Sequence, residues 1–172
     1  GTTLGTLTVL VGETYPVTLR RDISAAAAGL AVTARSADPV ITAVGAQATF
    51  QVNEAESILG VLGISPGTPT VTVYCGAEVV TTFDVVVAPA TLTVTPVTVV
   101  VGDTTLMTVI RAGGDQTVSL TVALGVDYAG VITLPATVTI PAGESSVPVT
   151  VTGVRLLRNQ VTVRATADGY AT

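Results

Sequence analysis

The fold is decided by a pattern that occurs twice in the chain, as Val9-Leu10-Val11-Gly12-Glu13-Thr14 and as Val99-Val100-Val101-Gly102-Asp103-Thr104. In each copy, three apolar residues lead into a glycine, an acidic residue and a threonine. A second apolar-rich stretch then follows, Val17–Leu19 in the first copy and Leu106–Ile110 in the second. Apolar runs on both sides of a Gly-acidic turn predict two β-strands joined at that turn. The repetition predicts two domains of one type, each of which opens with strand, turn and strand.

The rest of the chain alternates apolar and polar residues, which is the period of a half-buried strand and not of a helix. Val and Thr, whose β-branched side chains favour strands, make up 63 of the 172 residues. Because glycine- and proline-containing turns separate the runs, we expect an all-β fold of two tandem β-sandwiches. One short segment, Ser24–Gly29, has four alanines before its glycine and predicts a single helical turn. The clearest expected strands are Thr6–Val11, Thr70–Tyr74, Val79–Val87, Thr91–Thr95, Thr117–Ala123, Thr137–Ile140, Val147–Thr152 and Gln160–Ala165.

The boundary between the two domains is predicted at Ala88-Pro89-Ala90, because one expected strand ends at Val87 and the next begins at Thr91. The domains then comprise residues 1–88 and 91–172. A linker of about three residues that contains a proline leaves the two domains little freedom.

The composition excludes several kinds of chemistry. The chain has no His and no Lys, which excludes imidazole metal ligands, Ser–His pairs and lysine Schiff bases. A single Cys excludes a disulfide within the chain, and no apolar run is long enough to span a membrane as a helix. Seven arginines and 3% aromatic residues argue against nucleic acid as a partner. We therefore expect no enzyme activity and no cofactor.

The first half resembles the bacterial Ig-like domains of group 2. The resemblance covers most of residues 6–88 and is carried by three stretches: Val11-Gly12-Glu13-Thr14, Ala34-Arg35-Ser36-Ala37-Asp38-Pro39-Val40-Ile41 and Gly63-Ile64-Ser65-Pro66-Gly67-Thr68. It implies an Ig-like β-sandwich for this half of the chain.

The second half resembles the Calx-β-like and related Ig-like repeats of bacterial surface proteins. The matching stretches are Thr91-Leu92-Thr93-Val94-Thr95-Pro96, Val126-Asp127-Tyr128, residues 138–146 and Ala167-Asp168-Gly169-Tyr170. Such repeats are extracellular spacers, adhesin stalks and surface-layer parts, so the resemblance implies a location outside the cell. Calx-β domains can bind calcium through clustered acids, which makes Asp127 and Glu144 the calcium candidates. Solvated acids in turns are the alternative, because the acidic residues of this half are spread singly over several turns.

Three other groups have a structural and a functional interpretation. Cys75 is a small buried residue or the site of an intersubunit disulfide. Arg20-Arg21-Asp22 is a solvated turn or an interface ion pair. The tyrosines are core and corner residues, or a sugar-binding surface; they are Tyr15, Tyr128 and Tyr170.

The two halves end differently. The first closes with two strands around Cys75-Gly76, whereas the second has the strand Gln160–Ala165 and then only Asp168-Gly169-Tyr170-Ala171-Thr172. By internal comparison the last strand of the second sandwich is absent, which predicts an open sheet edge and an apolar groove. An extended stretch of a second copy, Gly1–Val9, is uncharged and β-prone and is the candidate donor of a strand. The expected interface residues are Leu4, Leu7, Val9, Val161, Val163 and Tyr170.

The sequence therefore favours a structural subunit of an extracellular bacterial fibre or surface layer. Its partner is a second copy of itself, added head to tail by strand donation. The alternatives are tandem spacer domains of a long monomeric adhesin or stalk, and a module that binds a carbohydrate or a host receptor. No cluster of aromatic residues or arginines supports the binding module.

Overall fold

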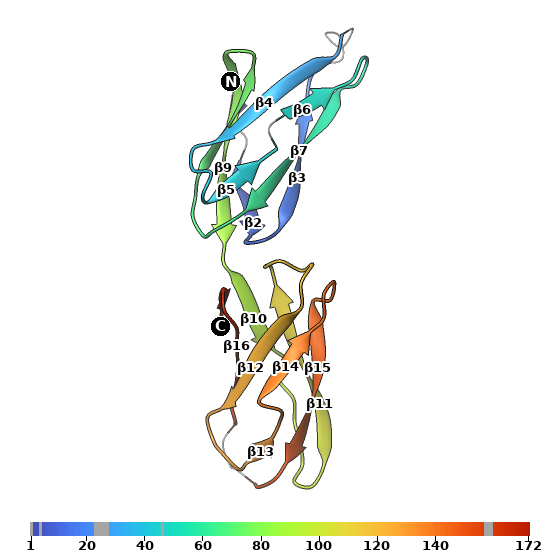
Figure 1. Cartoon of the computed structure of the whole chain (residues 1–172), viewed down its shortest axis with the longest axis vertical. Coiled ribbons are helices and arrows are strands. Elements are labelled where there is room, and N and C mark those ends of the chain that lie inside the picture. Colours follow the sequence, from blue (N-terminus) through green and yellow to red (C-terminus); the bar gives the residue numbers. More distant parts are fainter. Residues whose placement is uncertain (1, 4, 23–27, 46, 157–159) are drawn as a thin grey trace. The chain divides into compact units, whose positions relative to one another are not determined.

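The computed structural model describes residues 1–172 except residues 1, 4, 23–27, 46 and 157–159 (Figure 1). The described residues form seventeen β-strands and no helix, which confirms the all-β class. The expected helical turn at Ser24–Gly29 falls largely on residues outside the described ones. No described helix could span a membrane. The chain divides into a first unit, Gly1–Pro89, and a second unit, Ala90–Thr172, next to the expected boundary.

The first unit is a sandwich of two sheets. One sheet has the order β1-β9-β8-β4-β6, with β2 also paired to β9, and the other has the order β3-β7-β5. Alternate residues of both sheets point inward and form one core, which includes Leu59, Val71 and Phe83. The strands are β1 (Thr2–Thr3), β2 (Leu7–Leu10), β3 (Thr14–Arg20), β4 (Leu30–Ser36), β5 (Thr42–Val44), β6 (Gln47–Phe50), β7 (Glu56–Gly63), β8 (Thr70–Cys75) and β9 (Glu78–Ala88).

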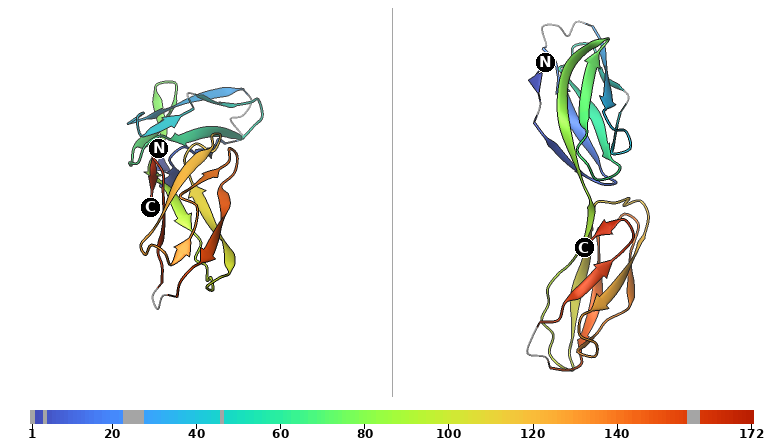
Figure 2. Two further views of the ribbon diagram at one scale, coloured as in Figure 1. Left: turned by 60° about the horizontal axis from the view of Figure 1, so that its bottom comes forward. Right: turned by 90° about the vertical axis from the view of Figure 1, so that its left-hand side faces the viewer.

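The second unit is also a two-sheet sandwich, with sheet orders β14-β12-β16 and β13-β15-β11-β10-β17. Its core is separate from the first and includes Met107, Val122 and Ile140. Figure 2 shows the strands of both units from two further sides. The strands are β10 (Ala90–Val94), β11 (Thr104–Ala112), β12 (Leu120–Val126), β13 (Ile132–Thr133), β14 (Thr137–Ile140), β15 (Ser146–Gly153), β16 (Val163–Thr166) and β17 (Tyr170–Ala171).

The two units share one strand register with a constant offset of 90 residues. Thr14 pairs with Leu62 in the first unit, and Thr104 pairs with Thr152 in the second. Leu30 pairs with Phe50, and Leu120 pairs with Ile140. The bridge between Val11 and Gly63 recurs between Val101 and Gly153. The repeated opening in the sequence is therefore the start of a repeat that continues without insertion to the end of β7 and β15.

The turn within the repeated opening requires its glycine. Gly12 and Gly102 have φ angles of 81° and 89°, which is a region that other residues rarely adopt. The amide of each glycine donates to the carbonyl of the glycine at the end of the opposite strand, Gly63 at 2.8 Å and Gly153 at 2.9 Å. The sequence pattern therefore marks the point where the opening segment meets β7 or β15.

Two expected strands differ in position from those observed. The strand expected at Thr117–Ala123 is β12, which begins at Leu120. Thr117 instead closes a turn, because its amide and hydroxyl both donate to the Asp115 carboxylate. The strand expected from Gln160 is β16, which begins at Val163. The amide of Thr162 donates to the Asp127 carboxylate at 2.9 Å and so lies outside the strand ladder.

Candidate functional site

The two units differ in what lies beside β8 and beside its equivalent in the second unit, β16. In the first unit, β9 lies between β8 and β2, antiparallel to β8 and parallel to β2. In the second unit, β16 pairs only with β12 among the described strands. Residues 97–100, which are equivalent to β2, form no described strand. The place that β9 fills in the first unit is therefore open in the described part of the second.

A groove of about 680 Å³ occupies this open place. One wall is the segment 94–99, the other is 160–163, and Met107 and Val151 belong to its lining. Met107 and Val151 also belong to the core and are 1% and 2% exposed, so the floor of the groove lies next to the core. Large exposed apolar side chains are concentrated around it: Val97, Val100, Val101, Val154 and Leu156. Surfaces of this kind mark sites of interaction.

The first unit shows what fits in this place. Phe83, Val85 and Val87 of β9 point inward and are at most 2% exposed, while Asp84 between them points outward. The strand bonds along both edges, to β8 on one side and to β2 on the other. The groove therefore has the geometry to accept an extended peptide that carries apolar side chains at alternate positions.

The structure brings some of the expected interface residues together and separates others. Val161 and Val163 are half-buried and line the groove. Tyr170 lies in β17, which pairs in parallel with β10, and its hydroxyl donates to the Gly113 carbonyl at 3.2 Å. Leu7 and Val9 lie in β2 and pack into the core of their own unit, where Val9 is 3% exposed. Leu4 lies outside the described residues.

The two calcium candidates do not meet. Asp127 directly follows the end of β12, whereas Glu144 follows β14, which runs antiparallel to β12. The pairing of Leu120 with Ile140 places Glu144 near the start of β12, at the opposite end of the sandwich from Asp127. Asp127 and Glu144 therefore cannot be ligands of one calcium ion within the second unit. Over the described ranges, no group of three or more acidic or cysteine side chains gathers in a way that could hold a metal ion.

Sequence reasoning missed the role of Arg21 and Arg111, which we call the arginine clamps because each side chain binds backbone carbonyls of neighbouring loops. Arg111 is 2% exposed, and its guanidinium donates to five backbone carbonyls in two loops. Arg21 stands 90 residues earlier and donates to three carbonyls, of which each has its equivalent among the partners of Arg111. For example, the Nε atom of Arg21 donates to the Glu54 carbonyl at 2.8 Å, and that of Arg111 donates to the Glu144 carbonyl at 2.8 Å. Arg21 and Arg111 stand at the same distance after Gly12 and Gly102, and this repeated spacing could have predicted that they have the same structural role.

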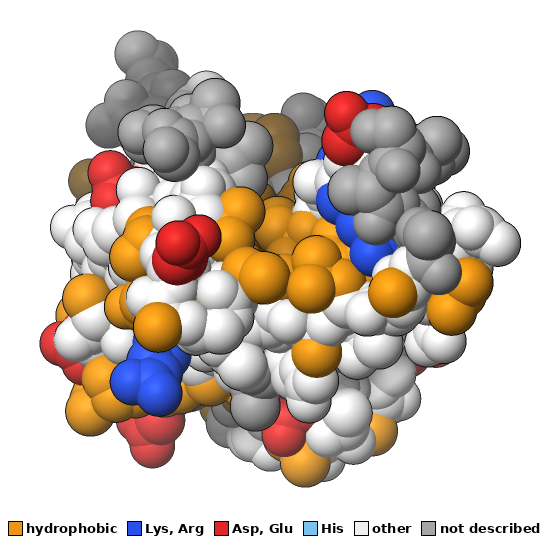
Figure 3. Space-filling view, turned by 90° about the horizontal axis from the view of Figure 1, so that it is seen from above, with side chains coloured by type: hydrophobic (Ala, Val, Ile, Leu, Met, Phe, Trp, Pro, Cys, Tyr) orange, Lys and Arg blue, Asp and Glu red, His pale blue; other side chains and the backbone are white. Residues whose placement is uncertain are grey.

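Arg21 is therefore not part of a solvated turn. Its guanidinium also lies 5.2 Å from the centre of the Phe50 ring. Arg20, beside it in the sequence, is exposed and forms an ion pair with Glu56 at 2.9 Å. Seen from above, apolar side chains gather in an area bordered by arginine side chains (Figure 3). Arg20, Arg21 and Arg111 thus hold loops and strands together.

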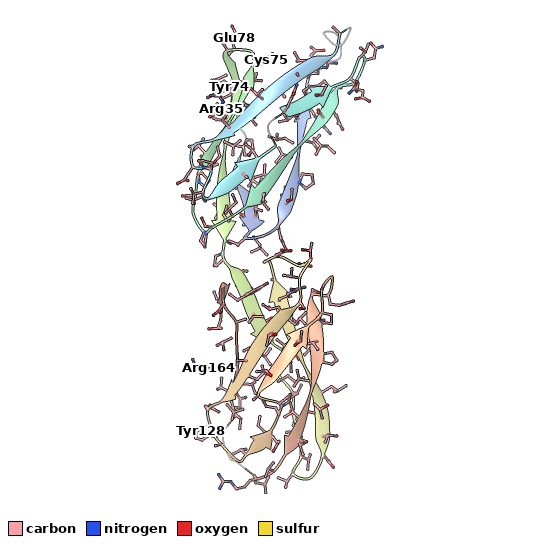
Figure 4. All side chains as sticks on the ribbon, viewed as in Figure 1. Arg35, Tyr74, Cys75, Glu78, Tyr128 and Arg164 are labelled. Carbon is pink, nitrogen blue, oxygen red and sulfur yellow. The ribbon has the colours of Figure 1, made fainter. Side chains whose placement is uncertain are left out.

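The remaining candidates do not form a second site. Arg35, Tyr74, Cys75 and Glu78 lie in the same part of the first unit (Figure 4). The Arg35 guanidinium is 5.8 Å from the centre of the Tyr74 ring, and the Cys75 thiol is free and half-buried. Tyr15 and Tyr128 are about half exposed, at 49% and 46%, so they are not core residues as expected. Tyr15 belongs to the first unit, whereas Tyr128 and Tyr170 belong to the second.

No family model matches the chain, and no curated protein matches it in sequence. Its fold is similar to several solved structures. The D0-D1 domain of intimin is 16% identical over 94% of this chain and 88% of that chain, with a TM-score of 0.38. The adhesin InvE of Yersinia pseudotuberculosis is 20% identical over 96% and 54%, with a TM-score of 0.37. The surface-layer protein SbsC is 22% identical over 78% and 18%, with a TM-score of 0.34. The chain thus spans about half of InvE and less than a fifth of SbsC.

Proposed function

We propose that this chain is a non-catalytic structural subunit of an extracellular bacterial fibre or surface layer. Copies join head to tail when a strand from one copy completes the second unit of the next. The observation that carries the proposal is the groove in the second unit, at the place where the first unit holds β9. A contact of this kind joins two different surfaces, so its repetition gives an open array unless rotation closes a ring.

The composition supports a subunit whose surface is covered in an assembly. Charged residues are 11% of the chain and apolar residues 48%, with a mean hydropathy of +0.70. In a small soluble domain, charged residues typically make up about a quarter to a third of the surface. The resemblance of the second half to repeats of bacterial surface proteins supports a location outside the cell. Surface adhesins and surface-layer proteins with similar folds are the setting that we propose.

A specific observation favours a second candidate, the spacer of a long monomeric stalk. The constant offset of 90 residues between the two units is what a tandem array of identical modules would show. In a stalk the open strand position would be filled by neighbouring modules of the same polypeptide, and purified copies of this chain would not join in a defined order.

Assembly as a function of concentration distinguishes the two candidates. Light scattering and electron microscopy of the 172-residue chain are expected to show filaments or sheets that grow with concentration. Val161→Arg places a charge in the groove and is expected to abolish assembly, because a buried unpaired charge is costly. Leu106→Arg is the matched control, since Leu106 is 64% exposed in the same unit and does not line the groove. A monodisperse monomer at high concentration would overturn the subunit proposal and leave the spacer.

A further inference from the structure

We infer that the first unit bears tension along the chain, and that the parallel pairing of β1 and β2 with β9 is the mechanical lock that resists its unfolding. This inference rests on the proposed function, because a fibre subunit and a stalk spacer both transmit a pull from one end of the chain to the other. Resistance to forced unfolding is a property that assembly alone does not require.

The lock joins the first strands of the unit to its last strand. β1 and β2 both run parallel to β9, and Leu7 at the start of β2 lies opposite Val85. The amide of Val11, just after β2, donates to the Ala88 carbonyl at 3.0 Å. A pull on the two ends of the unit therefore acts on β1 and β2 from one side and on β9 from the other, so the lock lies on the path of the force.

The parallel direction determines how a pull loads the hydrogen bonds of the lock. Tension from the amino-terminal side reaches β2 at Leu7, and tension from the carboxyl-terminal side reaches β9 at Ala88, at the opposite end of the ladder. The strands are pulled past each other, so all hydrogen bonds between them bear the load together. Antiparallel strands joined to the same chain ends would instead be separated from one end, one bond after another.

Both partners of the lock are anchored on their other sides. β9 is paired with β8 along its second edge, and Val87 exchanges two hydrogen bonds with Gly67, at 2.8 and 3.1 Å. The turn after β2 is fixed to the end of β7, because the Gly12 amide donates to the Gly63 carbonyl at 2.8 Å and the Gly63 amide donates to the Glu13 carbonyl at 3.0 Å. Neither partner can follow the other, so the pull must break the lock itself.

Burial also opposes slippage of the lock. Val9 is 3% exposed, and Val85 and Val87 are at most 2% exposed. Leu7 and Val11 pack against the same core. A slip of β2 by one residue along β9 would turn these apolar side chains away from the core, and water has little access to replace a stretched hydrogen bond there.

Single-molecule force spectroscopy in two attachment geometries tests the inference. In a Cys75→Ser background, handles on Gly5→Cys and Pro89→Cys load the lock in shear, whereas handles on Gly5→Cys and Glu78→Cys pull β2 and β9 from the same end. A Cβ atom at Gly5 has no other atom within 4 Å, and Pro89 and Glu78 are exposed, so the three sites can accept a cysteine. At one loading rate we expect an unfolding force about threefold higher in shear, with equal thermal unfolding of the two proteins. Equal forces would overturn the inference.

A matched pair of variants tests the lock in the shear geometry. Val11→Pro removes the amide that donates to Ala88, whereas Val44→Ala removes packing against the same core from β5, outside the lock. Val11→Pro is expected to lower the unfolding force by about half, and Val44→Ala to leave it within about a tenth of its value. If the two variants lower the force equally, the pairing with β9 is not the lock.

Light scattering of the untethered 172-residue chain reports assembly independently of force. If the chain assembles and unfolds at the same force in both geometries, the mechanical lock is wrong and the proposed function stands. If the force difference is found and the chain stays a monomer at high concentration, the lock stands as a property of a stalk spacer and the assembling subunit is wrong.

Discussion

The two units have the same register from their opening strand to the end of β7 and β15, and they differ in the strand that should close each sandwich. In the first unit β9 runs from Glu78 to Ala88 and seals the core between β8 and β2. In the second unit β17, Tyr170–Ala171, pairs with the start of β10 as β9 pairs with β1, so β17 corresponds to the first residues of β9. The repeated sequence therefore specifies the strand register that the two sandwiches share. A single strand, β9, covers the open side of the first sandwich.

The largest effect is expected at the arginine clamps, where the two units differ in burial. Arg111→Met removes the donor for five carbonyls around a side chain that is 2% exposed, so it should lower the free energy of unfolding of the second unit by about 4 kcal/mol. Arg21→Met removes three bonds at a more exposed site and should cost the first unit about 1 kcal/mol. Calorimetry that resolves one transition for each unit measures both. Equal losses would show that burial does not distinguish the clamps.

The next largest effect comes from making the second unit like the first. Adding the sequence of residues 82–88 after Thr172 should complete the sheet, because the pairing of β17 with β10 gives Thr172 the position that Thr81 has beside β1. Burial of three apolar side chains and two ladders of hydrogen bonds, less the entropy of ordering the strand, is expected to stabilise the second unit by about 3 kcal/mol. The same extension should abolish assembly, as measured by light scattering.

A control extension distinguishes closure from added length. Replacing the valines equivalent to Val85 and Val87 with Asp in the added sequence should give neither stabilisation nor loss of assembly. If this control acts like the matching extension, the groove is not the place where copies join.

A smaller effect is expected at the glycines that face the opening segment. A Cβ atom at Gly63 would lie 2.7 Å from the Leu10 carbonyl oxygen and 2.9 Å from Val87 Cγ1. Gly63→Ala should therefore cost the first unit about 2 kcal/mol, because β2 is held in place by β9. A Cβ at Gly153 would lie 2.3 Å from the Val100 carbonyl oxygen, and the bridge between Val101 and Gly153 holds that backbone in place. Gly153→Ala should cost the second unit at least as much, and thermal unfolding of each variant checks the ratio.

The smallest effect concerns a polar atom that distinguishes the two cores. Thr42 is fully buried, and its hydroxyl has no hydrogen-bond partner among the described residues. The equivalent residue in the second unit is Ile132, as the pairings with Gly63 and Gly153 show. Thr42→Val should stabilise the first unit by about 1 kcal/mol, since it removes an unsatisfied buried group and keeps the shape of the side chain. Thr42→Ser, which keeps the hydroxyl and loses the methyl group, should destabilise it in the same denaturant titration.

The sequence by itself determined the class of the fold, the two-domain organisation and most of the strands. These depend on local features: the alternation of β-branched and polar residues, the glycines of the turns, and the copied opening at Val9–Thr14 and Val99–Thr104. It also predicted an open edge in the second half, because the two halves could be compared with each other.

Only the tertiary structure decided which distant groups meet. Because β12 and β14 run antiparallel, Asp127 and Glu144 lie at opposite ends of the sandwich. The sequence around either residue does not predict this separation. Arg21 and Arg111 act as clamps because loops far away in the sequence present backbone carbonyls to them. The local sequence around a charged residue beside a turn does not show whether that residue is solvated or buried. Leu7 and Val9 are apolar in either setting, and it is the ladder with β9 that assigns them to their own core in the monomer. Local patterns specify strands, whereas the pairing of strands depends on contacts between residues that are far apart in the chain.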